Sequence, residues 1–151
     1  MHKINWKFDN TYSKLSESFR EFVKPTPVHN PEIVIFNHQL AKELNLDFSK
    51  TSNLELSKIF SGNILPEETK TLAQAYAGHQ FGHFTMLGDG RAVLLGEHLD
   101  SKKNRYDIQF KGSGRTSFSR GGDGRAALGP MLREYIISEA IHSLNIPTTR
   151  S

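Results

Sequence analysis

The stretch from Phe110 to Arg125, FKGSGRTSFSRGGDGR, places four cationic side chains and five glycines in one short segment with a single acid, Asp123. Glycine loses more conformational entropy on folding than any other residue, so it recurs where the backbone adopts unusual dihedral angles or approaches another group closely. The cations beside this backbone indicate that the group is an anion. The stretch therefore limits the chain to folds in which a glycine-rich loop leaves room for an anionic ligand.

Strands are predicted on the N-terminal side of this loop. Residues Tyr106 to Lys111 alternate between apolar and polar side chains, which predicts a strand that ends in Lys111. Two earlier runs, Phe84 to Leu87 and Arg91 to Leu95, are separated by Gly88-Asp89-Gly90, and this pattern predicts a hairpin. The loop is thus expected to follow an antiparallel sheet.

A helix is predicted on the other side, over Met131 to Leu144, with a face of apolar residues wide enough that we expect it to be buried. Before the sheet we expect four short helices and one strand, namely helices over 12–23, 38–44 (capped by Asn37), 54–60 and 66–76, and a strand over 32–36. The predicted fold class is α+β, divided into a mostly helical N-terminal extension (residues 1–75) and a segment of antiparallel strands plus a buried helix (residues 76–151).

The amino-acid composition limits the kinds of ligand and partner that the chain is expected to bind. The chain has no cysteine, so it forms neither a disulfide nor a cysteine-ligated zinc site. We find no signal peptide and no run of the roughly 20 apolar residues that a membrane helix needs, so we expect a cytoplasmic protein without membrane contact. The formal net charge is +3, yet residues 100–125 alone hold seven Lys and Arg against three Asp. Such local basicity favours a discrete anionic ligand, and the scarcity of interleaved aromatic residues argues against nucleic acid, RNA included.

The order of these parts occurs in the small lobe of protein kinases, where a glycine turn covers phosphates and a strand lysine pairs with a helix glutamate. Lys111 and Glu134 are the corresponding residues here. The kinase glycine pattern itself is absent, because Gly88-Asp89-Gly90-Arg91 lacks a third glycine and the valine that follows it. Each of these features also has a plain interpretation when it is considered alone. The turn can be an ordinary β-turn, Lys111 can be a solvated charge at a strand edge, and Glu134 can be an exposed acid on a helix.

Other candidate sites have weaker signals. A P-loop requires its lysine after the glycines, whereas Lys111 precedes them. His79 and His83 have a metal-ligand spacing on a helix, but the neighbouring glycines disfavour a continuous helix, and a turn that packs Tyr76, Phe81 and Phe84 against the hairpin is preferred. The loop hydroxyls have no identifiable base partner, so we expect them to bond within the loop or to phosphate: Ser113, Thr116, Ser117 and Ser119.

Two longer strings carry a specific resemblance. YAGHQFGHFTMLGDGRAVLLGE and DIQFKGSGRTSFSRGGDGRAALGPMLREYIISEAIHSLNIPTTRS resemble the N-terminal region of the selenoprotein O (YdiU) family, densely from Tyr76 to Ser151. Phe110 and Ser117 stand where leucine and proline are common in that family, and neither departure changes a charge. The resemblance implies a protein-kinase-like small lobe with an N-terminal extension, as a fragment of a larger two-lobed protein.

The resemblance also implies a function. The family binds ATP in a flipped orientation and transfers AMP to Ser, Thr or Tyr hydroxyls of proteins, so ATP and protein substrates are the expected partners. Nucleotide binding would fall on seven residues: Gly88, Gly90, Arg91, Lys111, Asp123, Gly124 and Glu134. Asp123 would accept hydrogen bonds from the adenosine.

The family's catalytic aspartate and its ligands for Mg²⁺ or Mn²⁺ are expected beyond Ser151. This segment alone is therefore expected to be inactive and to bind nucleotide weakly. Three alternatives stay open: kinase-type phosphoryl transfer, a non-catalytic nucleotide-sensing or scaffold module, and transfer of UMP in place of AMP.

Overall fold

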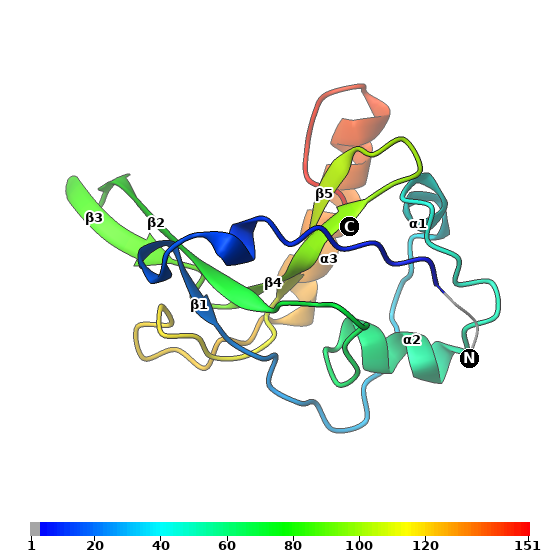
Figure 1. The fold of residues 1–151 in the computed structure, drawn as a ribbon, viewed down its shortest axis with the longest axis horizontal. Coiled ribbons are helices and arrows are strands. Elements are labelled where there is room, and N and C mark those ends of the chain that lie inside the picture. Colours follow the sequence, from blue (N-terminus) through cyan, green and yellow to red (C-terminus); the bar gives the residue numbers. More distant parts are fainter. Residues whose placement is uncertain (1–3) are drawn as a thin grey trace.

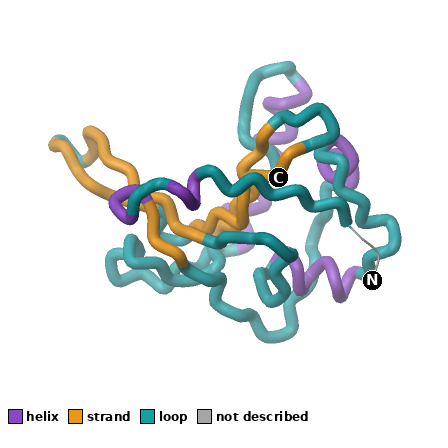
Figure 2. Tube along the Cα trace, in the orientation of Figure 1, coloured by secondary structure: helices purple, strands orange, loops and turns teal. Residues whose placement is uncertain are grey.

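The structure is a computed structural model that describes residues 4–151, and it has the predicted α+β composition. Five antiparallel strands form the sheet: β1 (Arg20–Phe22), β2 (Leu72–Gln80), β3 (His83–Gly88), β4 (Ala92–Leu99) and β5 (Arg105–Lys111) (Figure 1). The α-helices are α1 (His38–Glu43), α2 (Asn53–Phe60) and α3 (Leu128–Ser143), and short 3-10 helices cover Tyr12–Lys14 and Glu17–Phe19. Long loops connect these elements (Figure 2). Within the described residues, no helix combines the length and apolar character that crossing a membrane requires.

β4 is the buried strand on which the sheet is built. Seven of its eight residues are buried, and it pairs with β5 along its length and with β2 through Leu72 and Leu94. The strand order is β1-β2-β4-β5, with β3 paired to β2 outside that path. The β4–β5 register sets Lys111 opposite Ala92, directly after the Gly88–Arg91 turn. The sheet thus brings the strand lysine to the glycine turn.

The hairpin predicted around Gly88-Asp89-Gly90 is wrong, because β3 pairs with β2 and not with β4. β3 folds back through Phe81 and Gly82, whose φ angles of 58° and 81° suit the two left-handed positions of a type I′ turn. The β2–β3 hairpin projects from the body of the sheet (Figure 1). Gly88–Arg91 connects that hairpin to β4.

The helix predicted over 66–76 is also wrong, since this region runs into β2. Glu68 has a φ of 64°, which an α-helix does not allow. Leu72 is buried and pairs with Phe22 of β1 on one side and with Leu94 of β4 on the other. Strand pairing therefore overrides the local helix-start signal of the proline and the acids.

The two short helices of the first half are confirmed. The Asn37 side chain caps α1 by accepting a hydrogen bond from the Leu40 N–H at 3.0 Å, and Ser52 caps α2 in the same way from Glu55 at 3.2 Å. The helix predicted over 12–23 is replaced by the two 3-10 helices and β1.

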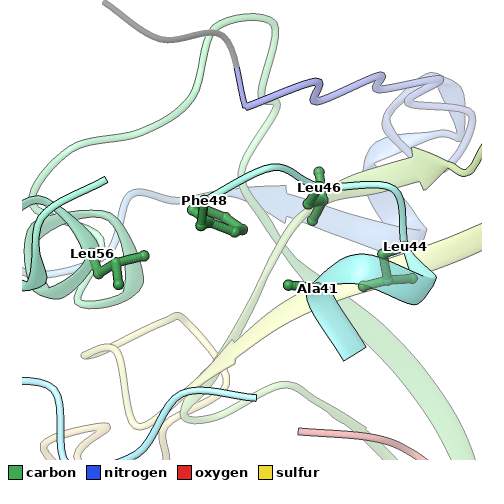
Figure 3. Close-up of a cluster of buried hydrophobic side chains, with 5 residues drawn as sticks. All are labelled: Ala41, Leu44, Leu46, Phe48 and Leu56. Atoms are coloured by element: carbon green, nitrogen blue, oxygen red, sulfur yellow. The ribbon is translucent and has the colours of Figure 1, made fainter. Parts of the chain in front are cut away.

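The strand predicted over 32–36 does not form; two of its apolar residues pack against a buried cluster, and Val34 and Ile35 are exposed. Ile33 and Phe36 contact this cluster, which joins α1 to α2 and consists of Ala41, Leu44, Leu46, Phe48 and Leu56 (Figure 3). The boundary that we predict between residues 75 and 76 lies inside β2, and the division of the chain into an extension and a lobe stays a prediction.

The C-terminal helix forms where predicted but is not buried, contrary to expectation. Ser138 is its buried residue, whereas Ile136 and Ile137 are 61% and 57% exposed. Polar contacts attach α3 to the rest of the chain, from Glu134 to Lys111 and from Glu139 to Arg150. The apolar face on its other side is not covered by any element within residues 4–151.

Candidate functional site

One cavity of about 610 Å³ lies where the glycine turn, the end of β5 and the glycine-rich loop meet. Six of the seven residues predicted to bind nucleotide line it: Gly88, Gly90, Arg91, Lys111, Asp123 and Gly124. Two further arginines of the loop, Arg120 and Arg125, also line the cavity. Positive charge from three different segments therefore faces one space, as an anion site requires.

The seventh predicted residue, Glu134, lies behind the cavity and holds the lysine. The Lys111 ammonium donates to both carboxylate oxygens of Glu134, at 2.7 and 2.6 Å. The two side chains are 41% and 50% exposed, so this ion pair adds little to folding stability. An ammonium has three N–H donors, and two are directed at Glu134, which leaves the third for a ligand in the cavity.

The glycine turn is anchored through Asp89. Its backbone N–H donates to the Gln74 carbonyl at 2.9 Å, and its carboxylate accepts from the Gln74 N–H at 3.1 Å and from the Gln109 amide at 3.2 Å. Burial raises the pKa of the Asp89 carboxyl, and the bond from Gln74 offsets part of that rise. These bonds tie the turn to β2 and β5, so its position follows from the sheet.

The glycine-rich loop packs directly on that turn. Thr116 and Ser119 donate from their hydroxyls to the carbonyls of Asp89 and Gly90, both at 2.6 Å. A side chain at Gly88 would collide with the ring of Phe118, so glycine is required for this contact. The hydroxyls of Thr116 and Ser119 therefore hold the loop on the turn.

The base of the loop closes on itself around Gly124. This residue has a φ of 69°, and a Cβ there would collide with the Gly114 carbonyl. Asp123 accepts a hydrogen bond from the Arg125 N–H at 2.9 Å through one oxygen. The Arg115 guanidinium donates a hydrogen bond to the Gly122 carbonyl at 2.7 Å, so this cation stabilises the conformation of the loop.

The structure separates the two histidines considered as metal ligands. His79 pairs with Phe84 and His83 with Gln80, and neighbouring positions of a strand point to opposite faces. His79 and His83 therefore lie on opposite faces of the β2–β3 hairpin. Among residues 4–151, no group of three or more His, Cys, Asp or Glu side chains is arranged to hold a metal ion.

The structure also adds cavity residues that the sequence analysis missed. Tyr76 and Gln80 of β2 and Leu87 of β3 line the cavity from the hairpin. The three aromatic residues expected to pack against a hairpin at Gly88-Asp89-Gly90 belong instead to the β2–β3 hairpin, where they are exposed: Tyr76 is 54%, Phe81 66% and Phe84 70% accessible. The alternation of polar and small residues in LAQAYAGHQ is the signal that would have placed Tyr76 and Gln80 on one face of a strand.

Comparison with known proteins identifies the family of this chain. A family model described as protein adenylyltransferase SelO matches residues 2–151. The protein nucleotidyltransferase YdiU of Pelagibacter ubique is 68% identical over 148 residues, which cover 98% of this chain and 31% of that protein. The proteins of the same name from Nitrosococcus oceani and Anoxybacillus flavithermus are 65% and 63% identical over 98% and 97% of this chain, and 30% and 31% of their own lengths. The chain thus spans about 30% of the length of these curated relatives.

Proposed function

The chain belongs to the SelO family of protein adenylyltransferases, and from that membership we propose that it is the nucleotide-binding part of an enzyme that transfers AMP from ATP to Ser, Thr or Tyr hydroxyls of proteins. The observation that carries this proposal is the cavity in which the glycine turn, Lys111 and the glycine-rich loop converge. In this proposal β4, β5 and α3 correspond to the small lobe of a kinase-like fold, with Lys111 and Glu134 as its lysine–glutamate pair.

The residues of the cavity suit a triphosphate. The free N–H of Lys111 supplies a charged donor for a phosphate oxygen, and the guanidinium groups of Arg91 and Arg120, which line the same cavity, can contact further oxygens. In AMP transfer, the acceptor hydroxyl attacks the α-phosphorus and the bond from that phosphorus to the bridging oxygen breaks. Pyrophosphate leaves with the bonding electron pair, and the hydroxyl proton passes to a base. The cations lower the barrier by stabilising the negative charge that gathers on the leaving pyrophosphate.

The divalent metal of this reaction, Mg²⁺ or Mn²⁺, has no fitting donor set among residues 4–151, which supply no group of three or more acidic or histidine ligands. We assign no step to it here. We propose that the metal ligands and the catalytic aspartate belong to a part of the enzyme outside this chain, and that the chain alone is inactive.

The test uses the full-length protein that contains these 151 residues, incubated with ATP labelled on the α- or the γ-phosphate. We expect protein-bound label from the α position, release of pyrophosphate, and no transfer by the Lys111→Met variant. Retention of the γ label would contradict AMP transfer and support phosphoryl transfer. Retention of neither label, with ATP binding intact, would instead support a nucleotide-sensing or scaffold module. Parallel reactions with labelled UTP distinguish AMP from UMP transfer.

A further inference from the structure

Residues 20–28, which we call the strap, comprise β1 and the segment that follows it, and they run beside the glycine-rich loop (Figure 1). The strap contains Pro25 and Pro27, whose rings fix φ near −65°. A proline also restricts the residue before it to extended backbone, so Thr26 between the two prolines is held extended. The strap is therefore a short and stiff piece of chain.

The strap is anchored at both ends on parts of the chain other than the loop. At its start, β1 pairs with β2. At its other end the Asn63 side chain accepts a hydrogen bond from the Val28 N–H at 2.8 Å and donates one to the Val28 carbonyl at 2.7 Å. Pro25 is buried against Gly62, where a Cβ would collide with the proline ring. The sheet and the end of α2 therefore set the position of the strap.

The strap contacts the first half of the glycine-rich loop at two points. The Thr26 N–H donates to the Ser113 carbonyl at 2.7 Å, and the Thr26 side chain packs so closely on Gly114 that a Cβ there would collide with it. Further along the loop, the half-buried Glu21 carboxylate accepts a hydrogen bond from the Ser117 N–H at 2.9 Å. Glu21 therefore holds the loop one residue before its cavity-lining part begins.

The end of the loop is held on the strap through Arg125. Its guanidinium donates long hydrogen bonds to the carbonyls of Thr26 and Pro27, at 3.5 and 3.4 Å. The side chain of Arg125 thus contacts the strap although the residue lines the cavity. Between this contact and the one from Glu21 lies the part of the loop that carries Arg120 and the predicted nucleotide-binding residues at 123 and 124. The strap therefore holds both ends of the cavity-lining part of the loop.

We propose that Glu21 and Thr26 are positioning residues for nucleotide binding, and that the strap keeps the glycine-rich loop in the shape that the ligand requires. None of residues 20–28 lines the cavity, so the strap acts through the loop. A loop with five glycines has many conformations available, and the apparent affinity for a ligand falls by the fraction of molecules in the binding conformation. This inference rests on the proposed function, because its effect is measured as nucleotide affinity.

The experiment compares Glu21→Leu with Glu21→Gln in the full-length protein, with the ATP dissociation constant measured by calorimetry. Both substitutions remove the negative charge, but glutamine keeps an oxygen that can accept from the Ser117 N–H and leucine does not. We expect Glu21→Leu to weaken ATP binding about tenfold, as the loss of one hydrogen bond does, and Glu21→Gln to stay within about twofold of the unsubstituted protein. Glu17→Leu, at an exposed position on the 3-10 helix before β1, is the control and should change nothing.

The pair of variants separates positioning from charge. If Glu21 acted only through its charge, both substitutions would tighten the binding of an anionic ligand. That result would overturn the inference, and so would an unchanged ATP constant in Glu21→Leu or an equal loss of affinity in both variants.

Asn63→Ala tests the strap from its far end, and it decides the question if urea denaturation shows that Glu21→Leu does not fold. Asn63 is exposed, and its replacement releases Val28 without touching the loop. We expect Asn63→Ala to weaken ATP binding about two- to fivefold while the protein stays folded. An unchanged ATP constant in this variant would overturn the inference.

The proposed function is tested separately in the same assay by Lys111→Met. If Lys111→Met leaves ATP binding unchanged, the nucleotide site is wrongly placed and the role of the strap falls with it. If Lys111→Met weakens ATP binding while Glu21→Leu and Asn63→Ala do not, the inference about the strap alone is wrong.

Discussion

Replacing Lys111 by methionine separates the structural from the ligand-binding role of the Lys111–Glu134 pair. The methionine keeps an unbranched side chain that is one atom shorter and removes the charge. Both partners of the ion pair are 41% to 50% exposed, so its loss should lower the free energy of unfolding by less than about 1 kcal/mol. A hydrogen bond from a charged donor contributes about 1.5–3 kcal/mol to binding. We therefore expect the ATP dissociation constant to rise about 10- to 100-fold while the fold is retained.

A double-mutant cycle with Glu134→Gln completes the test. Glu134 lies outside the cavity lining and holds the ammonium through bonds of 2.6 and 2.7 Å, so Glu134→Gln should weaken ATP binding through Lys111 alone. In the Lys111→Met background its effect on the ATP constant should disappear. Titration calorimetry gives the constants, urea denaturation gives the unfolding free energies, and Lys102→Met is the control for the loss of one exposed cation. Additive effects of the two substitutions, or unchanged ATP affinity in Lys111→Met, would refute the reasoning.

Three further outcomes follow from the site and its surroundings. Gly124→Ala should weaken ATP binding by about tenfold or more in calorimetry, because a Cβ at a φ of 69° collides with a backbone carbonyl, whereas Gly129→Ala, which meets nothing within 4 Å, should have no effect. Asp89→Asn should tighten ATP binding about two- to fivefold in the same assay, since it removes a negative charge from the cavity wall, and weaker binding would contradict this. Arg150 lowers the pKa of Glu139 from about 4.5 to about 2, so the stabilisation is present above pH 4.5 and is lost as the pH falls toward 2. Glu139→Gln should therefore cost about 1–2 kcal/mol in urea denaturation at neutral pH, a difference that should shrink in acid; a constant difference would count against the ion pair.

Local patterns predicted the parts of the site that depend on neighbouring residues. The alternation before Lys111 predicted β5, and the apolar spacing after Gly129 predicted α3, so the lysine and Glu134 were each placed on the correct element. Their contact follows from the order of strand, loop and helix. The cap at Asn37 was predictable for the same reason, because a cap acts within one helical turn.

The features that the sequence did not predict depend on contacts between residues that are far apart in the sequence. Leu72–Gln80 is rich in alanine, and it becomes a strand only because it pairs with β1 and β4. Once that strand was taken for the end of a helix, the facing of Tyr76 and Gln80 toward the cavity could not be inferred. The exposure of α3 was missed because its periodicity shows a wide apolar face but not which element covers it.

The most direct test of the nucleotide site is a titration of the isotopically labelled chain with ATP, followed by the shifts of its backbone amide signals in NMR spectra. Such shifts report weak binding residue by residue. We expect saturable changes concentrated at Gly88–Arg91, Lys111 and 121–125, which surround the cavity. Changes that leave these amides unaffected and gather on another surface of the chain would contradict the assignment of this cavity to the nucleotide.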